Sequence, residues 1–440
     1  MDKGIAPLAV IASGIMLLAM VQSAQARPVF RKPVPDGVVE LSCSVRSFVE
    51  LKDGSLLSAD GQVSTDGGLT WNKTKSFGEG VGGSGIIRLQ SGALALSAGG
   101  SGMVGWWQPL RVWLSRDEGN SWEGPYSAEL LGGPLSDTMI QLSSGRLLWP
   151  TRACLANYAH PEFKYYDASS YGQWRGHRIQ ISGHYHYPEL DIAAVGYSDD
   201  EGKNWAVGST EHSLWGEASG QPRTFLSASG VLMGWFDARG IPGPNAEVTA
   251  CDEPNVAETA DGRVLFMARS TVGRLVYSYS SDQGETWTAV RPTALASSYS
   301  PPRLRRIPQT GDLICVWNQV SRGEIRRGYR RGRLSVAISK DSGATWENFK
   351  TLELSEGLKD IDHIKPEYPI TPVTAALDVG QLPDGWATFD YANVCFGNGK
   401  VFIMYYRGWL EESKNDEGEP TARKAGESVM RIYPLEWFYQ

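Results

Sequence analysis

The sequence predicts an all-β fold, a six-bladed β-propeller, on three observations. A motif of the form Ser-x-Asp-x-Gly-x-Thr-Trp, with small variations, occurs five times, with successive copies 51, 83, 82 and 59 residues apart. Short apolar strands bounded by turn residues lie between the copies, and no long amphipathic helix is evident. Small sheets that repeat around an axis and shield their own edges form a propeller.

The composition agrees with a large folded β protein. Of the 440 residues, 41% are hydrophobic and 21% are charged, which excludes a disordered chain. The 50 Gly, 24 Pro and 16 Trp favour many tight turns and aromatic-rich strands. A net charge of −7 makes nucleic acid a poor partner, so the run of arginines between Arg303 and Arg333 does not indicate a nucleic-acid patch.

The one long apolar stretch lies at the N-terminus. Lys3 precedes the apolar run Ile5–Val21, and Ala24-Gln25-Ala26 supplies the small residues that a signal peptidase reads. The run is short for a transmembrane anchor. We therefore expect residues 1–26 to be a signal peptide and 27–440 to be one propeller domain. The mature protein would be secreted or periplasmic, without a stable membrane span.

Neither the cysteines nor the histidines predict a metal or a cofactor. The five cysteines lack the CxxC spacing of a metal site and are too few for a disulfide scaffold. His184 and His186, with Glu189 and Asp191 nearby, carry a His-x-His pattern that can bind metal. On a strand, however, these two histidines share one face and can line a pocket without a metal. We expect no metal and no cofactor.

Each motif copy has the physics of a β-hairpin turn. The Asp accepts hydrogen bonds from turn amides, the Gly supplies the positive φ, and the Trp covers the end of the hairpin. We therefore assign the copies a structural role. A sixth, unmarked unit would combine the strand Ser428–Tyr433 with an N-terminal strand and close the propeller. The five copies are Ser64–Trp71, Ser115–Trp122, Ser198–Trp205, Ser280–Trp287 and Ser339–Trp346.

Five such copies resemble the Asp-box, or bacterial neuraminidase, repeats of the sialidase superfamily, over nearly the whole mature chain. The resemblance implies a site for a sugar that carries a carboxylate on its anomeric carbon. Arginines would clamp the carboxylate, because their planar fork pairs with it bidentately. The nucleophile would be a Tyr activated by a Glu, since the substrate would repel a carboxylate nucleophile. A separate acid would protonate the leaving oxygen.

Three stretches match the catalytic blades of that superfamily. The stretch Glu253–Glu258, followed by Met267–Ser270, resembles the blade that carries the catalytic Glu and the second clamp Arg. This match implies Glu253 as the base and Arg269 as a clamp residue. Arg331, which precedes the fifth box, resembles the third clamp Arg, and Tyr391 in Phe389-Asp390-Tyr391 resembles the nucleophile.

The first clamp Arg and the acid match less closely. The superfamily's Arg-Ile-Pro motif is replaced by Val45-Arg46-Ser47, in which Arg46 takes the place of the first clamp residue. The long loop that carries the acidic Asp is shortened to Ser58–Gln62, where Asp60 is the only Asp. Asp137, which enters the third blade, is the alternative acid.

These matches predict an exported retaining exo-glycosidase that hydrolyses terminal sialic acid or a related acidic sugar from a glycan. Two other hypotheses remain open. A non-catalytic propeller that binds acidic glycans is favoured by the shortened acid loop. A propeller glycosidase acting on a different sugar is favoured by the His184 region, which can rebuild the pocket. Trp106 and Trp107 suit either a sugar-stacking platform or a packed rim.

Overall fold

A computed structural model describes residues 32–99, 107–135, 137–154, 169–182, 191–210, 234–241, 247–249 and 251–440. The predicted signal peptide, the pair His184 and His186, and Trp106 lie outside this part of the chain. Within the described residues, no helix is long and apolar enough to cross a membrane.

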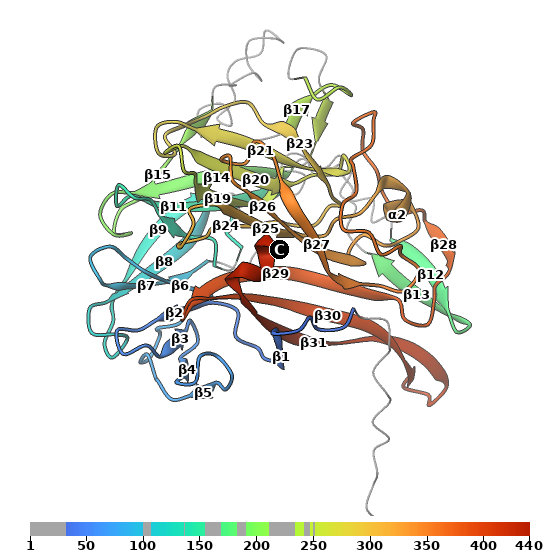
Figure 1. Cartoon of the computed structure of the whole chain (residues 1–440), viewed down its shortest axis with the longest axis horizontal. Coiled ribbons are helices and arrows are strands. Elements are labelled where there is room, and N and C mark those ends of the chain that lie inside the picture. Colours follow the sequence, from blue (N-terminus) through green and yellow to red (C-terminus); the bar gives the residue numbers. More distant parts are fainter. Residues whose placement is uncertain are drawn as a thin grey trace, which may run out of the picture.

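Six four-stranded antiparallel sheets make up most of the described chain, which confirms the predicted six-bladed β-propeller. In Figure 1 the colours pass from blue at the lower left through green and yellow at the top to red in the lower half. The first strands of neighbouring blades contact one another, as β2 does with β6 and with β29.

The first three blades come from the N-terminal half of the chain. Blade 1 contains β2 (Phe48–Glu50), β3 (Leu56–Ser58), β4 (Gln62–Ser64) and β5 (Asn72–Lys73). Blade 2 contains β6 (Gly85–Arg88), β7 (Leu94–Ala98), β8 (Trp107–Ser115) and β9 (Glu123–Leu131). Blade 3 contains β10 (Ile140–Gln141), β11 (Leu147–Cys154), β14 (Asp191–Ser198) and β15 (Ala206–Val207).

The other three blades follow in order. Blade 4 contains β19 (Asp252–Glu258), β20 (Val264–Arg269), β21 (Arg274–Ser280) and β23 (Arg291–Ala296). Blade 5 contains β24 (Arg303–Arg306), β25 (Leu313–Trp317), β26 (Arg333–Ser339) and β27 (Glu347–Leu354). Blade 6 contains β29 (Ala387–Gly397), β30 (Lys400–Lys414), β31 (Pro420–Pro434) and β1 (Val39–Ser42).

Smaller elements lie outside the blades. A three-stranded sheet joins β12 (Ser170–Trp174), β13 (His177–Ser182) and β28 (Asp378–Gln381). Two-stranded pairs join β16 (Ser209–Thr210) with β22 (Thr286–Trp287), and β17 (Gly234–Phe236) with β18 (Glu247–Thr249). The helix α2 (Arg322–Arg326) begins at a capping box on Ser321, and the 3₁₀ helix η2 (Leu435–Tyr439) ends the chain.

The N-terminal strand closes the ring. β1 pairs with β31 in antiparallel register, with Val39 opposite Ile432. This confirms the predicted closing unit, because the fourth strand of blade 6 comes from the opposite end of the chain. No hairpin turn can therefore connect the last two strands of blade 6, which explains why five boxes serve six blades.

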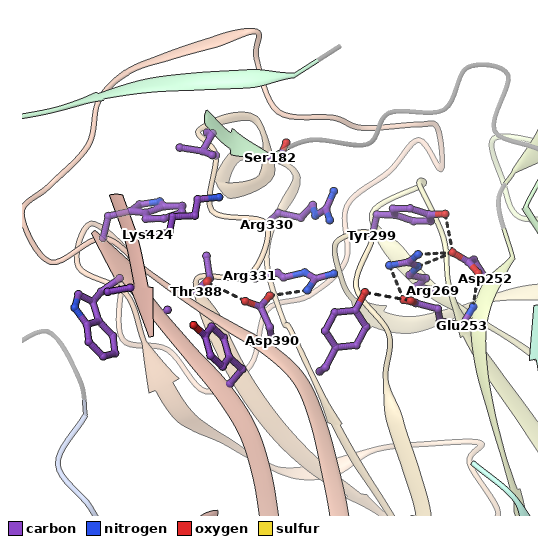
Figure 2. A pocket seen from close by; sticks show the side chains of 18 of the residues that line it. Ser182, Asp252, Glu253, Arg269, Tyr299, Arg330, Arg331, Thr388, Asp390 and Lys424 are labelled. Atoms are coloured by element: carbon purple, nitrogen blue, oxygen red, sulfur yellow. Dashed lines mark hydrogen bonds and ion pairs between the residues drawn. The ribbon is translucent and has the colours of Figure 1, made fainter. Parts of the chain in front are cut away.

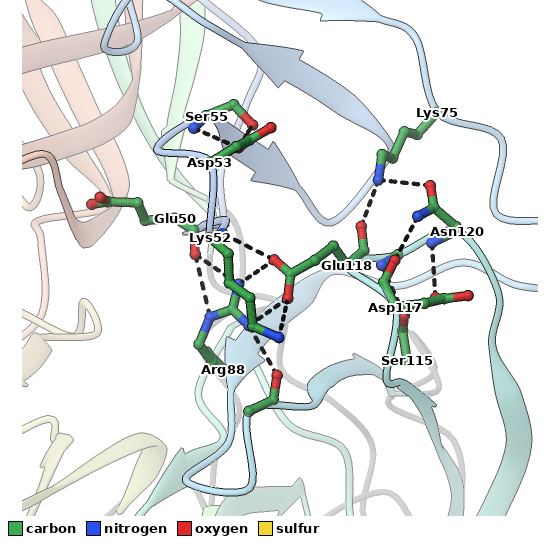
Figure 3. Close-up of polar contacts among 12 residues, drawn as sticks. Glu50, Lys52, Asp53, Ser55, Lys75, Arg88, Ser115, Asp117, Glu118 and Asn120 are labelled. Carbon is green, nitrogen blue, oxygen red and sulfur yellow. Dashed lines mark hydrogen bonds and ion pairs between the residues drawn. The ribbon is translucent and has the colours of Figure 1, made fainter.

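All five boxes have the same hydrogen bonds at the turn between the last two strands of a blade. In the second box, Ser115 Oγ donates to Asp117 at 2.9 Å (Figure 3). The side chain and the amide of Ser121 donate to the same carboxylate at 2.6 and 2.8 Å. The bonds from the side chain and amide of Ser121, and then the bond from Ser115, lower the pKa of Asp117 to about 2. Beside this box, Glu118 pairs with Arg88 at 2.7 Å and with Lys52 at 3.4 Å, which joins blades 1 and 2.

The box glycines let neighbouring blades approach closely. Gly343 has φ +88°, and a Cβ added there would lie 2.4 Å from Leu265 in the preceding blade. A Cβ added to Gly284 would likewise lie 2.8 Å from Leu148 in the blade before it. The Gly of the box therefore serves both the turn and the contact between blades.

A buried ion cluster ties the closing strand to its neighbours. Glu40 of β1 accepts hydrogen bonds at 2.9 Å from Arg407 and from Arg431, two buried arginines of β30 and β31. Arg431 also donates to Glu353 of β27 at 3.0 Å, and Tyr405 donates to Glu353 at 2.6 Å. Blade 5, blade 6 and the N-terminal strand thus share one charged cluster.

Candidate active site

A pocket of about 380 Å³ brings together four of the seven residues predicted from the sequence. Glu253 and Arg269 come from blade 4, Arg331 from the segment before β26, and Tyr391 from β29. Figure 2 shows Glu253, Arg269 and Arg331 turned toward the same space. Arg46, Asp60 and Asp137 are not among the residues that line it.

Glu253 and Tyr391 face each other from two first strands. The Tyr391 hydroxyl donates a hydrogen bond to Oε1 of Glu253 at 3.2 Å. Each residue lies where the pairing of its strand shifts register, and each has a positive φ, 48° for Glu253 and 50° for Tyr391. Bulges of this kind redirect side chains, and left-handed non-glycine residues concentrate at functional sites.

Arg269 is held between two carboxylates. Its Nη1 lies 2.5 Å from Glu253, and its Nε donates to Asp252 at 3.0 Å. Its guanidinium stacks 4.0 Å from the ring of Tyr299, whose hydroxyl donates to Asp252 at 2.9 Å. Burial lowers the pKa of Arg269, but Asp252 and Glu253 outweigh this and hold it well above its usual range. Arg269 therefore stays charged and fixes both carboxylates.

Arg331 lies over the ring of Tyr391. Its Nη1 pairs with Asp390 at 2.6 Å, and its guanidinium lies 4.7 Å from the Tyr391 ring. Thr388 donates to the second oxygen of Asp390 at 3.0 Å. Burial lowers the pKa of Arg331, and Asp390 then Tyr391 raise it above its usual value. The Nε of Arg331 is buried and has no hydrogen-bond partner in the described part of the chain.

Arg46 and Asp137 lie in a polar cluster beside the bulge at Tyr391. Arg46 donates through Nη2 to the carbonyl of Tyr391. Asp137 accepts from Ser47 at 2.8 Å, from Asn393 at 2.8 Å and from Arg305 at 2.9 Å. Arg46 thus contacts the backbone of the predicted nucleophile, and Ser47, Asn393 and Arg305 all donate to the Asp137 carboxylate.

Asp60 lies in the turn between β3 and β4. Its carboxylate accepts hydrogen bonds from Ser58 at 2.5 Å and from Gln62 at 2.9 Å. Burial raises the pKa of Asp60, but the bonds from Ser58 and Gln62 lower it below its usual value. A proton donor needs the opposite shift, so this geometry is that of a turn residue.

Several pocket residues were not predicted from the sequence. Asp252 and Asp390 directly precede Glu253 and Tyr391, and an acidic residue in that position is the one sequence feature that could have indicated them. Arg152 ends near the same carboxylates, 3.5 Å from Asp252 and 3.8 Å from Glu253. Lys424 of β31 also lines the pocket, and nothing in its local sequence marks it.

The pocket is more positive than the protein around it. Five basic side chains (Arg152, Arg269, Arg330, Arg331, Lys424) and three carboxylates (Asp252, Glu253, Asp390) line it. Five minus three gives a net charge of +2, in a chain of net charge −7. Among the described residues, no group of three or more His, Cys, Asp or Glu could hold a metal ion. The arrangement suits an anionic ligand.

Comparisons with known proteins concern the family and the fold. The family model "BNR repeat-like domain" matches residues 62–392. No curated protein matches the chain. A Dyadobacter fermentans protein of unknown function, at 15% identity and TM-score 0.46, aligns over 90% of this chain and 100% of its own. A Fusarium graminearum GH93 α-L-arabinofuranosidase, at 13% identity and TM-score 0.45, aligns over 90% of this chain and 94% of its own. Trypanosoma rangeli sialidase, at 14% identity and TM-score 0.44, aligns over 92% of this chain and 60% of its own.

Proposed function

The chain belongs to the BNR repeat-like domain family, and from this premise we propose that its pocket hydrolyses a glycosidic bond with retention of configuration. The proposed substrate is a glycan that ends in sialic acid or a related acidic sugar. The hydrogen bond between Tyr391 and Glu253 carries the proposal, because it pairs a neutral nucleophile with a carboxylate base inside a cationic pocket.

The chemistry follows from these two side chains. Glu253 takes the phenolic proton as Tyr391 Oη attacks the anomeric carbon, and the bond from that carbon to the leaving oxygen breaks. The leaving oxygen takes up a proton from solvent, and a glycosyl–tyrosine intermediate results. Water then attacks the same carbon and releases a proton to solvent, the bond from the carbon to Tyr391 Oη breaks, and Glu253 returns its proton to Tyr391. The sugar leaves with its original configuration. A tyrosine avoids the repulsion between two carboxylates that an acidic nucleophile would meet.

Arg331 is the best-placed group to bind the substrate carboxylate. Its Nε is buried without a partner in the described chain, beside the Tyr391 ring. Arg152 is the second choice, because its contacts with Asp252 and Glu253 are long, at 3.5 and 3.8 Å. Arg269 acts differently from the predicted clamp role, since it already holds two carboxylates.

One observation favours a second candidate, a propeller glycosidase for a different sugar. Both arginines of the predicted clamp that line the pocket are paired with carboxylates, Arg269 with two and Arg331 with one. A pocket with three carboxylates also suits the two-carboxylate scheme that most glycosidases apply to neutral sugars.

A panel of nitrophenyl glycosides separates these candidates. The panel contains an α-sialoside, a uronide and a neutral pentofuranoside, and nitrophenol departs without protonation by an acid. The proposal expects the highest kcat/KM on the sialoside or the uronide. A preference for the neutral glycoside would support the second candidate. No turnover on any of them would support the third hypothesis, a non-catalytic glycan-binding propeller.

We also propose that the protein is exported after cleavage before Arg27. The order of Lys3, the apolar run Ile5–Val21 and Ala24-Gln25-Ala26 supports this. Mass spectrometry of protein from the native host should find Arg27 or a close neighbour at the N-terminus. An intact Met1 would contradict cleavage.

A further inference from the structure

The pocket continues beyond the pair of Tyr391 and Glu253 along the long hairpin of blade 6. Strands β30 and β31 have 15 residues each, and their outer parts supply Tyr406, Trp409 and Lys424 to the pocket wall. Leu410, which pairs with Lys424, is buried in a cluster with Trp386 and with residues of β12 and β13. This packing holds the wall in place. In Figure 2, Lys424 and Thr388 lie on one side of Arg331, and Glu253 lies on the other.

Polar groups on this side have no acceptor in the described part of the chain. The Oγ of Ser182 and the Nε1 of Trp386 are buried, and neither has a hydrogen-bond partner there. Both residues line the pocket, and Trp386 is only 2% exposed. A buried donor without an acceptor costs free energy, so two such donors beside a pocket indicate a ligand that supplies oxygen atoms.

Lys424 adds a positive charge to the same wall. Its ammonium lies 6.0 Å from the ring of Trp386, and no ion pair or hydrogen bond of its side chain is found among the described residues. Burial lowers the pKa of Lys424, Asp390 raises it, and Arg330 and Arg331 lower it further, so that the net shift is downward. The ammonium of Lys424 is thus repelled by Arg330 and Arg331, and an anion bound here would offset that repulsion.

We propose that this wall is a second subsite, which binds the sugar on the leaving-group side of the scissile bond, and that this sugar carries an oxyanion. Trp409 and Tyr406 offer apolar faces to the sugar ring, while Lys424, Trp386 and Ser182 offer donors to its oxygens. A uronic acid and a sulfated hexose share the required chemistry. The placement beside the leaving group rests on the proposed function, but the anion preference of the wall does not.

Binding tests the subsite without catalysis. The Tyr391→Phe variant is titrated calorimetrically with methyl β-galacturonide, methyl β-galactoside 6-sulfate and neutral methyl β-galactoside. At least one anionic probe should bind 10-fold or more tighter than the neutral one. Adding Lys424→Met should abolish this preference, while Lys424→Arg should retain it. Lys414→Met, on the same hairpin but outside the pocket, is the matched control and should leave the preference intact.

Hydrolysis then places the subsite relative to the scissile bond. The substrates are N-acetylneuraminic acid linked to galactose, to galactose 6-sulfate and to galacturonic acid. Wild type should favour an anionic leaving sugar at least 10-fold in kcat/KM, and Lys424→Met should remove most of that ratio. Cleavage of nitrophenyl sialoside without any anion preference would overturn the subsite alone. Anion binding that depends on Lys424, without turnover of any glycoside, would overturn the proposed function and keep the subsite.

A folding control keeps the outcome decisive. Circular dichroism and the melting temperature of Lys424→Met should match those of Lys414→Met. If Lys424→Met is misfolded, Trp386→Phe removes the indole donor instead and should reduce the same preference. Equal binding of anionic and neutral probes by the Tyr391→Phe variant would overturn the proposal whatever the variants do.

Discussion

The hydroxyl of Tyr391 and the carboxylate of Glu253 are hydrogen-bonded at 3.2 Å although they lie 138 positions apart in the chain. Both residues lie at bulges of first strands, in blades 4 and 6, and both have left-handed backbone angles. Such conformations cost free energy for a non-glycine residue and persist where the surrounding structure enforces them. The strained pair is therefore the centre of the proposed mechanism.

The first prediction concerns this pair. Tyr391→Phe should lower kcat by about 10³-fold or more, and Glu253→Gln by about 10²-fold or more, because nucleophile and base act in the same step. Steady-state kinetics on the best nitrophenyl glycoside measures both. Tyr171→Phe, on β12 outside the pocket, is the control and should behave as wild type. A Tyr391→Phe variant with wild-type kcat would remove Tyr391 from the reaction.

The second prediction separates two roles for Arg46. Its guanidinium donates to the carbonyl of Tyr391 and does not line the pocket. Arg46→Met should therefore lower kcat about 10-fold or more while KM changes little, since the nucleophile loses its position. Arg331→Lys should instead raise KM about 10-fold, because an ammonium lacks the planar fork. If Arg46→Met raises KM and leaves kcat intact, Arg46 is a clamp residue, as the resemblance implied.

The third prediction is a pH dependence of stability. Burial raises the pKa of Glu40, but Arg407 and then Arg431 outweigh it and lower the pKa from 4.5 to about 2. A depressed folded-state pKa contributes stability above about pH 4.5, and this stability is lost as the pH falls toward 2. Allowing for screening, since 14% of the side chain is exposed, Glu40→Gln should cost about 2 kcal/mol at pH 7.

Urea unfolding at pH 7 and pH 3 measures this effect. The difference between wild type and Glu40→Gln should shrink at pH 3, because Glu40 is then almost fully protonated in the unfolded chain but still largely ionised in the folded protein. Glu417→Gln, in the exposed turn after β30, is the matched control and should change stability little at either pH. A Glu40→Gln penalty that does not depend on pH would show that its charge is not what stabilises the closure.

The fourth prediction uses two glycines with similar backbone angles. Gly343 (φ +88°) and Gly262 (φ +83°) are both left-handed, but only a Cβ at Gly343 would meet a neighbour, Leu265 at 2.4 Å. Gly343→Ala should therefore destabilise the fold by about 1–3 kcal/mol more than Gly262→Ala, through overpacking between blades. Denaturant unfolding of both variants gives the comparison. Equal penalties would mean that the box glycine serves the turn alone.

The blades were predictable because the boxes are local. Ser115, Asp117, Gly119 and Ser121 bond to one another within seven residues, so each copy leaves a complete signature in the sequence. The missing sixth box even marked the blade that the N-terminal strand closes. Sequence spacing carries such information whenever the interacting groups share one turn.

The site was predictable only in part, because its contacts join distant segments. Glu253, Arg269, Arg331 and Tyr391 lie next to recognisable strands and boxes, and all four line the pocket. The pairing of Arg152 with Asp252 spans blades 3 and 4, and no local pattern marks it.

The two candidate acids show the same limit. Asp137 is held by Arg305, 168 residues away, in a contact that its neighbours in sequence do not suggest. Asp60 is the only Asp in its shortened loop, yet its hydrogen bonds stay within that turn. Whether a loop carboxylate reaches a pocket depends on the path of the loop, which composition and spacing do not specify.

Covalent trapping tests the central claim most directly. A fluorinated sialic acid analogue with a good leaving group should form a slowly hydrolysed adduct, and peptide mass spectrometry should find the added sugar on Tyr391. The Tyr391→Phe variant, treated identically, should carry no label. A label on Asp390 or Asp252 would contradict the assignment of Tyr391 as the nucleophile. So would a Tyr391→Phe variant that hydrolyses a sialoside as fast as wild type does.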